Sequence, residues 1–202
     1  MMGLWLAAAP LVLASGSAVR RKLLEAAGIP VEVRPATLDE RAAEASAPRD
    51  DPSAVAALLA REKALRVAKD VPGRLVVGAD QTLALGNRRF DKPADRAGAR
   101  AQLQALAGRT HELHAAVAVA RGAEVLFAHV GVARLTMRPL SDAFLDRYLD
   151  AAGAAVTASV GGYQLEALGV HLFERIEGDH FTILGLPLLP LLAYLRTQGS
   201  LA

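Results

Sequence analysis

Two hydroxyls and three consecutive cations stand close together in the segment from Ser15 to Lys22. The segment follows an apolar run, predicted as a buried strand, and leads into a predicted helix that begins near Ala18. A helix N-terminus carries positive partial charge, so cations there are unfavourable unless something negative binds nearby. Backbone N–H groups, hydroxyls and a guanidinium together suit a phosphate. The segment therefore predicts a phosphate site, and the alternative is a solvated basic patch beside an ordinary Ser17 N-cap.

A carboxylate, Asp80, interrupts the apolar run that begins at Leu75. Burying a carboxylate in a strand costs free energy unless the group is paired or holds a metal ion. Asp80 is therefore a candidate for catalysis or metal binding, and the alternative is an aspartate that ends the strand and caps a turn. Gly78 beside it is predicted to let a ligand approach the backbone closely.

Two lysines are candidates for contact with an anion. Lys63 lies at the edge of the apolar face of a predicted helix, because Leu59 and Val67 stand four residues to either side. Its ammonium can reach into a cleft or simply extend to solvent along its apolar stem. Lys92 precedes Pro93, where another helix is predicted to start and an anion could bind.

Any metal ligand has to be oxygen or histidine nitrogen, because the chain contains no cysteine. The pair Asp39-Glu40 is a candidate metal or general-base pair in an acidic stretch, although loop carboxylates are usually solvated. His111 and His114 are not expected to chelate one ion, because strand residues three apart face opposite sides. Both are predicted to be structural or surface residues. Walker A and dinucleotide-binding fingerprints are absent from the sequence.

The strands and helices of the fold must position these residues. Apolar runs alternate with helical patterns along the chain, and this alternation predicts an α/β fold with helices packed on a sheet. Strands are expected at 10–14, 31–33 and 75–85, the last broken at Asp80, with a hairpin formed by 111–120 and 124–137. Helices are expected at 18–27, from Pro52 to about 69, from 93 to 108, from the Ser141 cap to 153, and at 188–196. The stretch 156–185 is rich in glycine and β-forming residues, and Gly161-Gly162 is predicted to be a turn.

Composition favours one compact unit. The 202 residues are expected to form a single domain, residues 1–202. Hydrophobic residues make up 52% of the chain and aromatic ones 4%, so alanine, valine and leucine must build the core. The formal net charge of +2 gives no broad basic surface, so no nucleic acid polymer is expected as a partner. The apolar N-terminal run lacks the preceding basic region of a secretory signal, and Pro10 interrupts it, so a cytoplasmic protein with no membrane association is expected.

Taken in order, segments of the sequence resemble the Maf family, also called septum-formation-inhibitor-like proteins. The matching segments span nearly the whole chain: LVLASGSAVRRKLLEAAG, the Asp39-Glu40 pair, LAREKA, VVGADQ, DKP, LAGRTH, GGYQLEALGVHLFERIEGDHFTILGLPL and the closing helix. The resemblance implies a two-lobed α/β fold with a mixed sheet around a deep central cleft, as in Maf-like and ITPase-like pyrophosphatases. It also implies hydrolysis of nucleoside triphosphates to the monophosphate and pyrophosphate.

The resemblance assigns roles to particular residues. The family's aspartate at the position of Asp80 is taken as the catalytic proton acceptor. Carboxylates such as Glu40 and Asp80 would hold a divalent cation, Mg²⁺ or Mn²⁺, and it stays open whether Asp80 acts as base, metal ligand or both. The positions implied to bind the triphosphate are Ser15, Ser17, Arg20, Lys63 and Lys92.

Three positions bear on base specificity. Family members that prefer dTTP and UTP typically have threonine and glutamine at the positions of Gln81 and Glu166. The residues found here resemble the branch that acts on 7-methyl-GTP, whereas Val19 matches neither branch. The resemblance therefore suggests non-standard or modified nucleotides as substrates, with the preferred base left open.

Two other functions compete with this interpretation. A non-catalytic nucleotide-binding regulator of cell division, which the family's older name suggests, would share the phosphate site but would not need Asp80. An exported binding protein would require cleavage of the N-terminal run. A homodimer is compatible with the sequence, which does not by itself define the oligomeric state.

Overall fold

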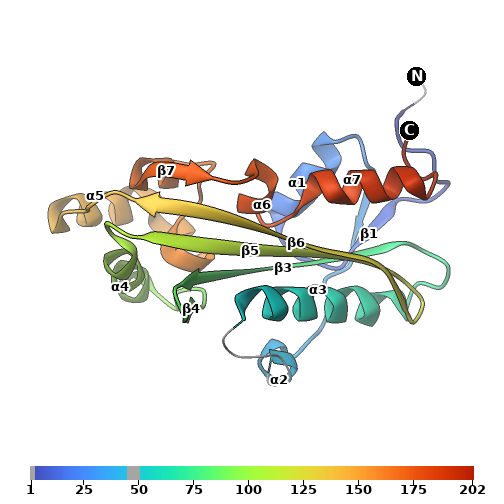
Figure 1. Ribbon diagram of the computed structural model, residues 1–202, viewed down its shortest axis with the longest axis horizontal. Helices are drawn as coiled ribbons and strands as arrows, with labels where there is room; N and C mark the ends of the chain where they lie inside the picture. Colours follow the sequence, from blue (N-terminus) through green and yellow to red (C-terminus); the bar gives the residue numbers. More distant parts are fainter. Residues whose placement is uncertain (1–2, 45–50) are drawn as a thin grey trace.

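The computed structural model describes residues 3–44 and 51–202 (Figure 1). Within these residues, seven strands form one mixed sheet of order β2-β1-β3-β5-β6-β7, and β4 pairs with β3 beside this path. β1 (Leu11–Leu13) is parallel to β2 (Val31–Val33) and to β3 (Val76–Leu85). The antiparallel strands are β4 (Arg88–Phe90), β5 (Thr110–Arg121), β6 (Glu124–Met137) and β7 (Phe173–Glu177). The predicted α/β class and the predicted β5–β6 hairpin are confirmed.

Helices lie on both sides of the sheet (Figure 1). α3 (Pro52–Ala68) runs along one face, with α2 (Glu40–Glu44) beside it. On the other side lie α1 (Ala18–Ala26), α6 (His180–Ile183) and α7 (Leu188–Thr197). α4 (Arg96–Leu106) and α5 (Asp142–Ala152) lie toward the end of the sheet away from β1.

β3 separates two apolar layers because its side chains alternate between the faces of the sheet. Val77 packs with Leu24 of α1 and with apolar residues of α7. Val76 packs instead with small residues of α3 such as Ala64. The same alternation directs Asp80 toward α3 and Gln81 toward α6.

α3 approaches β3 very closely at Gly78. A Cβ atom on Gly78 would lie 2.1 Å from the carbonyl oxygen of Ala60 and 2.6 Å from the backbone nitrogen of Ala64. The prediction that Gly78 admits a ligand is therefore wrong, because the backbone of α3 occupies this space. This packing brings Lys63 of α3 next to Asp80 of β3.

Two predicted boundaries are also wrong. β3 continues through Asp80, which stays paired in register with Ala116 of β5, because Lys63 compensates the buried charge. The helix expected from residue 93 begins at Arg96, because Asp95 is its N-cap and accepts a hydrogen bond from the backbone of the first turn.

The glycine-rich stretch after α5 contains little strand structure. It forms short 3₁₀ helices at Gly153–Thr157, Val160–Gly162 and Leu168–Leu172, followed by β7 and α6. Gly161 and Gly162 have φ values of +80° and +76°, a conformation that favours glycine, so the predicted turn is confirmed.

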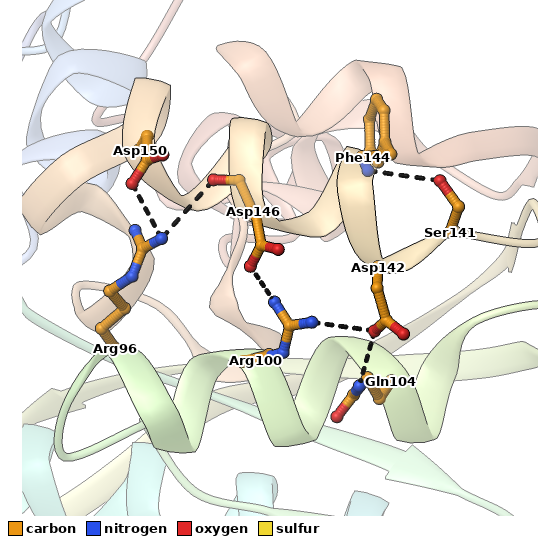
Figure 2. Close-up of polar contacts among 8 residues, drawn as sticks. All are labelled: Arg96, Arg100, Gln104, Ser141, Asp142, Phe144, Asp146 and Asp150. Carbon is orange, nitrogen blue, oxygen red and sulfur yellow. Dashed lines mark hydrogen bonds and ion pairs between the residues drawn. The ribbon is translucent and has the colours of Figure 1, made fainter.

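A ladder of polar contacts joins α4 to α5 (Figure 2). The side chains recur every four residues on each helix, which places them on facing surfaces. Nη2 of Arg100 is 2.8 Å from Oδ1 of Asp142, and Nη2 of Arg96 is 2.8 Å from Oδ1 of Asp150. The remaining members are Gln104 and Asp146.

The two ends of the chain lie together (Figure 1). Trp5 forms an isolated bridge with Leu201, and the backbone N–H of Leu6 donates to the carbonyl of Ser200. The first two residues of the N-terminal apolar run lie outside the described residues. Among the helices of 3–44 and 51–202, none is long and apolar enough to cross a membrane.

Candidate active site

A cavity of about 980 Å³ opens where β3 loses its neighbour β1. β1 pairs with β3 at Val76 and Val77, and β4 joins the same edge from Leu83 onward. The loop that leaves β1 and the start of α1 enter the gap between these pairings. Ligands of open α/β sheets commonly bind at such a point, beyond the carboxyl end of a parallel strand.

The structure brings all ten predicted site residues to this cavity. They come from the β1–α1 loop, α1, α2, α3, β3, the segment after β4 and the segment before the third 3₁₀ helix. The residues are Ser15, Ser17, Val19, Arg20, Glu40, Lys63, Asp80, Gln81, Lys92 and Glu166. Their individual roles stay predictions.

The ammonium of Lys63 lies between two carboxylates. Its Nζ is 2.6 Å from Oδ1 of Asp80 and 2.7 Å from Oε1 of Glu40. Asp80 is only 8% exposed, and this burial raises the pKa of its carboxyl group, while the charges of Lys63 and Arg20 offset part of the increase. Asp80 is thus a carboxylate with increased proton affinity, held in place by an ammonium.

The same residues fit a divalent cation that is shared with a substrate. Glu40 and Asp80 each have an oxygen within 2.7 Å of the Lys63 ammonium, so an ion held by both carboxylates would lie beside that ammonium or replace it. Within the described residues, no group of three or more histidine, aspartate and glutamate side chains could hold a metal ion by itself. Mg²⁺ is commonly bound by one or two carboxylates together with substrate phosphates and water. Glu40 and Asp80 supply that kind of donor set.

The predicted N-cap of the first serine segment is confirmed, and the phosphate site there stays a prediction. Ser17 is the N-cap of α1, since its Oγ accepts a hydrogen bond from the backbone N–H of Arg20 at 3.3 Å. The Oγ of Ser15 accepts hydrogen bonds from the backbone of Ser17 and from Nη1 of Arg20. Each hydroxyl keeps its own hydrogen for donation to a phosphate.

Arg20 is fixed by backbone carbonyls as well as by Ser15. Its Nε donates to the oxygen of Gly185 at 2.8 Å, and its Nη1 donates to the oxygen of Ala79 at 2.8 Å. Burial lowers the pKa of its guanidinium, and the negative charges of Asp80 and Glu40 partly offset that decrease. The guanidinium therefore occupies a defined position at the edge of β3.

Gln81 links β3 to α6. Its Nε2 donates to the carbonyl oxygens of Thr182 at 3.1 Å and Ile183 at 3.0 Å. Both amide hydrogens are thereby used, which leaves Oε1 as the polar atom that a ligand could approach. Glu166, in contrast, is an exposed carboxylate at the cavity.

Sequence reasoning missed an ion pair inside the cavity. Nη2 of Arg89, on β4, is 2.9 Å from Oε2 of Glu44, at the end of α2. The spacing of Glu40 and Glu44, four residues apart, was the available signal for a shared helix face. Nothing local connects Glu44 to Arg89, which is 45 residues away.

Within 3–44 and 51–202, the charged side chains that line the cavity balance formally. Five are cations, namely Arg20, Arg41, Lys63, Arg89 and Lys92. Five are carboxylates, namely Glu40, Glu44, Asp80, Asp91 and Glu166. A polyanion that enters this site must therefore change the partners of the cations or bring positive charge with it.

The two histidines of β5 have separate structural contacts. Nε2 of His111 is 2.7 Å from the hydroxyl oxygen of Tyr163, inside the protein core. Nδ1 of His114 is 2.8 Å from Oγ of Ser53, at the start of α3. The prediction that they do not act together is confirmed.

Comparisons with known proteins show the family of this chain. A family model described as Maf-like protein matches residues 10–198. The nucleoside triphosphate pyrophosphatase of Rhodopseudomonas palustris (strain BisB18) is 59% identical over 201 residues and covers 100% of both chains. The 7-methyl-GTP pyrophosphatase of Mesorhizobium japonicum is 53% identical over 195 residues, 95% of this chain and 97% of that protein.

Among solved structures, the nucleoside-triphosphatase, dITP/XTP pyrophosphatase, of Mycobacterium abscessus covers 95% of each chain with 17% identity and a TM-score of 0.39. The family is assigned from the sequence comparisons alone: the family model spans residues 10–198, and the relative from Rhodopseudomonas palustris spans the whole chain. This chain belongs to the Maf family.

Proposed function

We propose that this protein hydrolyses nucleoside triphosphates to nucleoside monophosphates and pyrophosphate. The observation that carries the proposal is the buried Asp80 carboxylate, of raised pKa, in one cavity with Ser15, Ser17, Arg20 and Lys92. A relative that is 59% identical over its whole length bears the name nucleoside triphosphate pyrophosphatase, which supports the same conclusion.

In the proposed reaction Asp80 accepts a proton from a water molecule that attacks the α-phosphorus. The new bond forms between the water oxygen and phosphorus, while the bond from phosphorus to the bridging oxygen of the leaving pyrophosphate breaks. A raised pKa suits this role because a base is most effective when its pKa lies near the operating pH. Lys63 orients the carboxylate through its 2.6 Å contact, and Arg20 and Lys92 stabilise the charge of the departing pyrophosphate.

We propose a divalent cation, Mg²⁺ or Mn²⁺, as the cofactor. Glu40 and Asp80 would hold it together with phosphate oxygens. When bound, the ion supplies positive charge that offsets the charge of the phosphates.

Among substrates we propose modified guanine nucleotides such as 7-methyl-GTP, whose removal would clear non-standard nucleotides. Glu166 supports this choice because N7-methylation makes the guanine ring positive, and an exposed carboxylate at the cavity attracts that charge, although water screens the attraction. The relative named 7-methyl-GTP pyrophosphatase, 53% identical, supports it as well.

The test is pyrophosphate release from a panel of natural and modified nucleoside triphosphates, with Mg²⁺, with Mn²⁺ and with chelator. Asp80→Asn keeps the shape of the side chain and loses its charge, so turnover should fall by at least about a hundredfold while nucleotide still binds. Near-normal turnover of a folded variant would remove Asp80 from the mechanism. Binding without hydrolysis by the unmodified protein would favour the alternative, a nucleotide-binding regulator of cell division.

A further inference from the structure

The ion pair between Arg89 and Glu44 lies inside the cavity but has no part in the mechanism above. Both side chains line the cavity, and they are 27% and 26% exposed. Solvent still reaches about a quarter of each side chain, so the pair is partly screened, and fixing two long side chains costs entropy that offsets part of its stabilising effect. Its position in the cavity also puts the guanidinium within reach of a bound ligand.

Glu44 shares its helix with Glu40, and both glutamates contact cations of the cavity. Glu40 contacts Lys63 and Glu44 contacts Arg89, so the two ion pairs join α2 to α3 and to β4. None of the residues of α2 is buried, so apolar packing contributes little to holding this helix against the cavity. The glutamates thus present carboxylates to two cations that could also bind phosphate.

A triphosphate changes this balance. It carries roughly three to four negative charges near neutral pH, and it enters a cavity that, among the described residues, is lined by five cations and five carboxylates. Of the two cations that α2 contacts, Arg89 is the more accessible, because its side chain is 27% exposed and that of Lys63 is 11% exposed. The planar guanidinium of arginine matches two oxygens of one phosphate, whereas Glu44 meets it through a contact between Nη2 and Oε2 at 2.9 Å.

We propose that Arg89 is a further phosphate-binding residue, and that Glu44 occupies its guanidinium until the triphosphate displaces it. This inference rests on the proposed function. Arg89 and Lys92 both line the cavity, and a guanidinium matches the oxygens of a phosphate, so we assign Arg89 to the phosphate chain and not to the base. Glu44 competes with substrate, and its release frees α2 on the side of β4.

The proposal predicts opposite effects for the two partners of one ion pair. Arg89→Ala removes a phosphate contact and should weaken binding about tenfold or more, the usual loss for a hydrogen bond to a charged group. Glu44→Gln removes the competitor and should tighten binding severalfold. In the double variant, Glu44→Gln should no longer increase the affinity, because Glu44 acts only through Arg89.

Calorimetric titration measures these effects without turnover. The probes are inorganic tripolyphosphate, which has no base, and a GTP analogue with a methylene group in place of the α,β-bridging oxygen. The ion pair of Arg74 and Glu32 is a matched control, because its Nη2–Oε2 distance is 3.0 Å, its side chains are 28% and 32% exposed, and it lies outside the cavity lining. Arg74→Ala and Glu32→Gln should leave both affinities unchanged. Arg89→Gln replaces the alanine variant if that variant does not fold.

Weaker binding in both Arg89→Ala and Glu44→Gln would overturn the proposal, since it would mean that the pair only supports the site. Unchanged affinities in both would overturn it as well. Pyrophosphate release by the unmodified enzyme is assayed in parallel. Absence of release would refute the proposed function, while opposite shifts in tripolyphosphate affinity would still assign Arg89 to phosphate binding. Normal release with no shift in either variant would refute this inference alone.

Discussion

His111 carries its imidazole into the core, where its side chain is 0% exposed and contacts Tyr163 and Phe173. Burial lowers the pKa of His111 to about 4, because the low-dielectric surroundings disfavour the charged form. Its hydrogen bond with the Tyr163 hydroxyl is compatible with a neutral ring. This residue connects β5 to the turn that borders the cavity, so its charge state bears on the integrity of the site.

Stability should therefore depend on pH through His111. Below about pH 6.5 the unfolded chain binds a proton at this residue, whereas the folded protein does so only near pH 4. The stability that the neutral His111 ring contributes is fully present above the pKa of His111 in the unfolded chain. It is lost as pH falls toward the pKa of His111 in the folded protein, by up to about 3 kcal/mol. The free energy of unfolding in urea should differ less between pH 7 and pH 5 for His111→Gln than for the unmodified protein. The exposed His129→Gln is the control, and an equal pH dependence in all three proteins would contradict the assignment.

At the scale of elements, the contact of α3 with β3 determines the geometry around Asp80. The backbone of α3 lies where any side chain at position 78 would have to go. Lys63 is held by that contact, and its ammonium bridges Asp80 and Glu40. A shift of α3 away from the sheet would separate these groups.

Gly78→Ala should therefore impair both stability and catalysis. A Cβ atom 2.1 Å from the Ala60 carbonyl forces α3 outward, at a cost of at least about 2 kcal/mol. The free energy of unfolding, measured with denaturant, and kcat should both decrease. Gly98→Ala is the control, because a Cβ there has a nearest contact of 3.4 Å and alanine favours the helix α4. A Gly78→Ala variant as stable and active as the unmodified protein would show that α3 and β3 can separate freely.

At the scale of the whole molecule, the proposed base specificity depends on segments that are far apart in sequence. Glu166 follows the turn at Gly161-Gly162, and Gln81 lies on β3 with its amide hydrogens committed to α6. The backbone N–H of Gly161 donates to Oε1 of Gln102 on α4 at 3.0 Å, and α4 is itself joined to α5 by the polar contacts in Figure 2. We therefore assign Glu166, rather than the Gln81 amide, to the charge of a methylated guanine.

Glu166→Gln should reduce the ratio of kcat/KM for 7-methyl-GTP to that for GTP, because the variant loses the attraction to the charged ring. Adding Gln81→Thr should move preference further toward dTTP and UTP, and should also loosen α6. Steady-state assays with the four nucleotides measure both effects, with Glu174→Gln, an exposed residue of β7, as the control. If the unmodified enzyme already prefers dTTP, this account of specificity fails while the pyrophosphatase proposal stands.

Much of this protein could be predicted from local patterns in the sequence. The buried strand β1, the cap and proline that start α3, and the β5–β6 hairpin follow from hydrophobic period and turn residues. Ten of the residues that line the cavity were also identified, partly from misplaced charges such as Asp80 and partly from the family resemblance. These features can be predicted from the sequence because each depends on residues that are near one another in the chain.

Partners of the site residues were decided only by the tertiary structure. The sequence does not say that Lys63 bridges two carboxylates or that the Arg20 guanidinium binds backbone carbonyls. The Arg89–Glu44 pair and the role of Gly78 were equally invisible. Each of these contacts arises where an element packs against another from a distant part of the chain, and burial then sets the charge and the hydrogen bonds of the residues involved. No local pattern encodes which distant groups will meet.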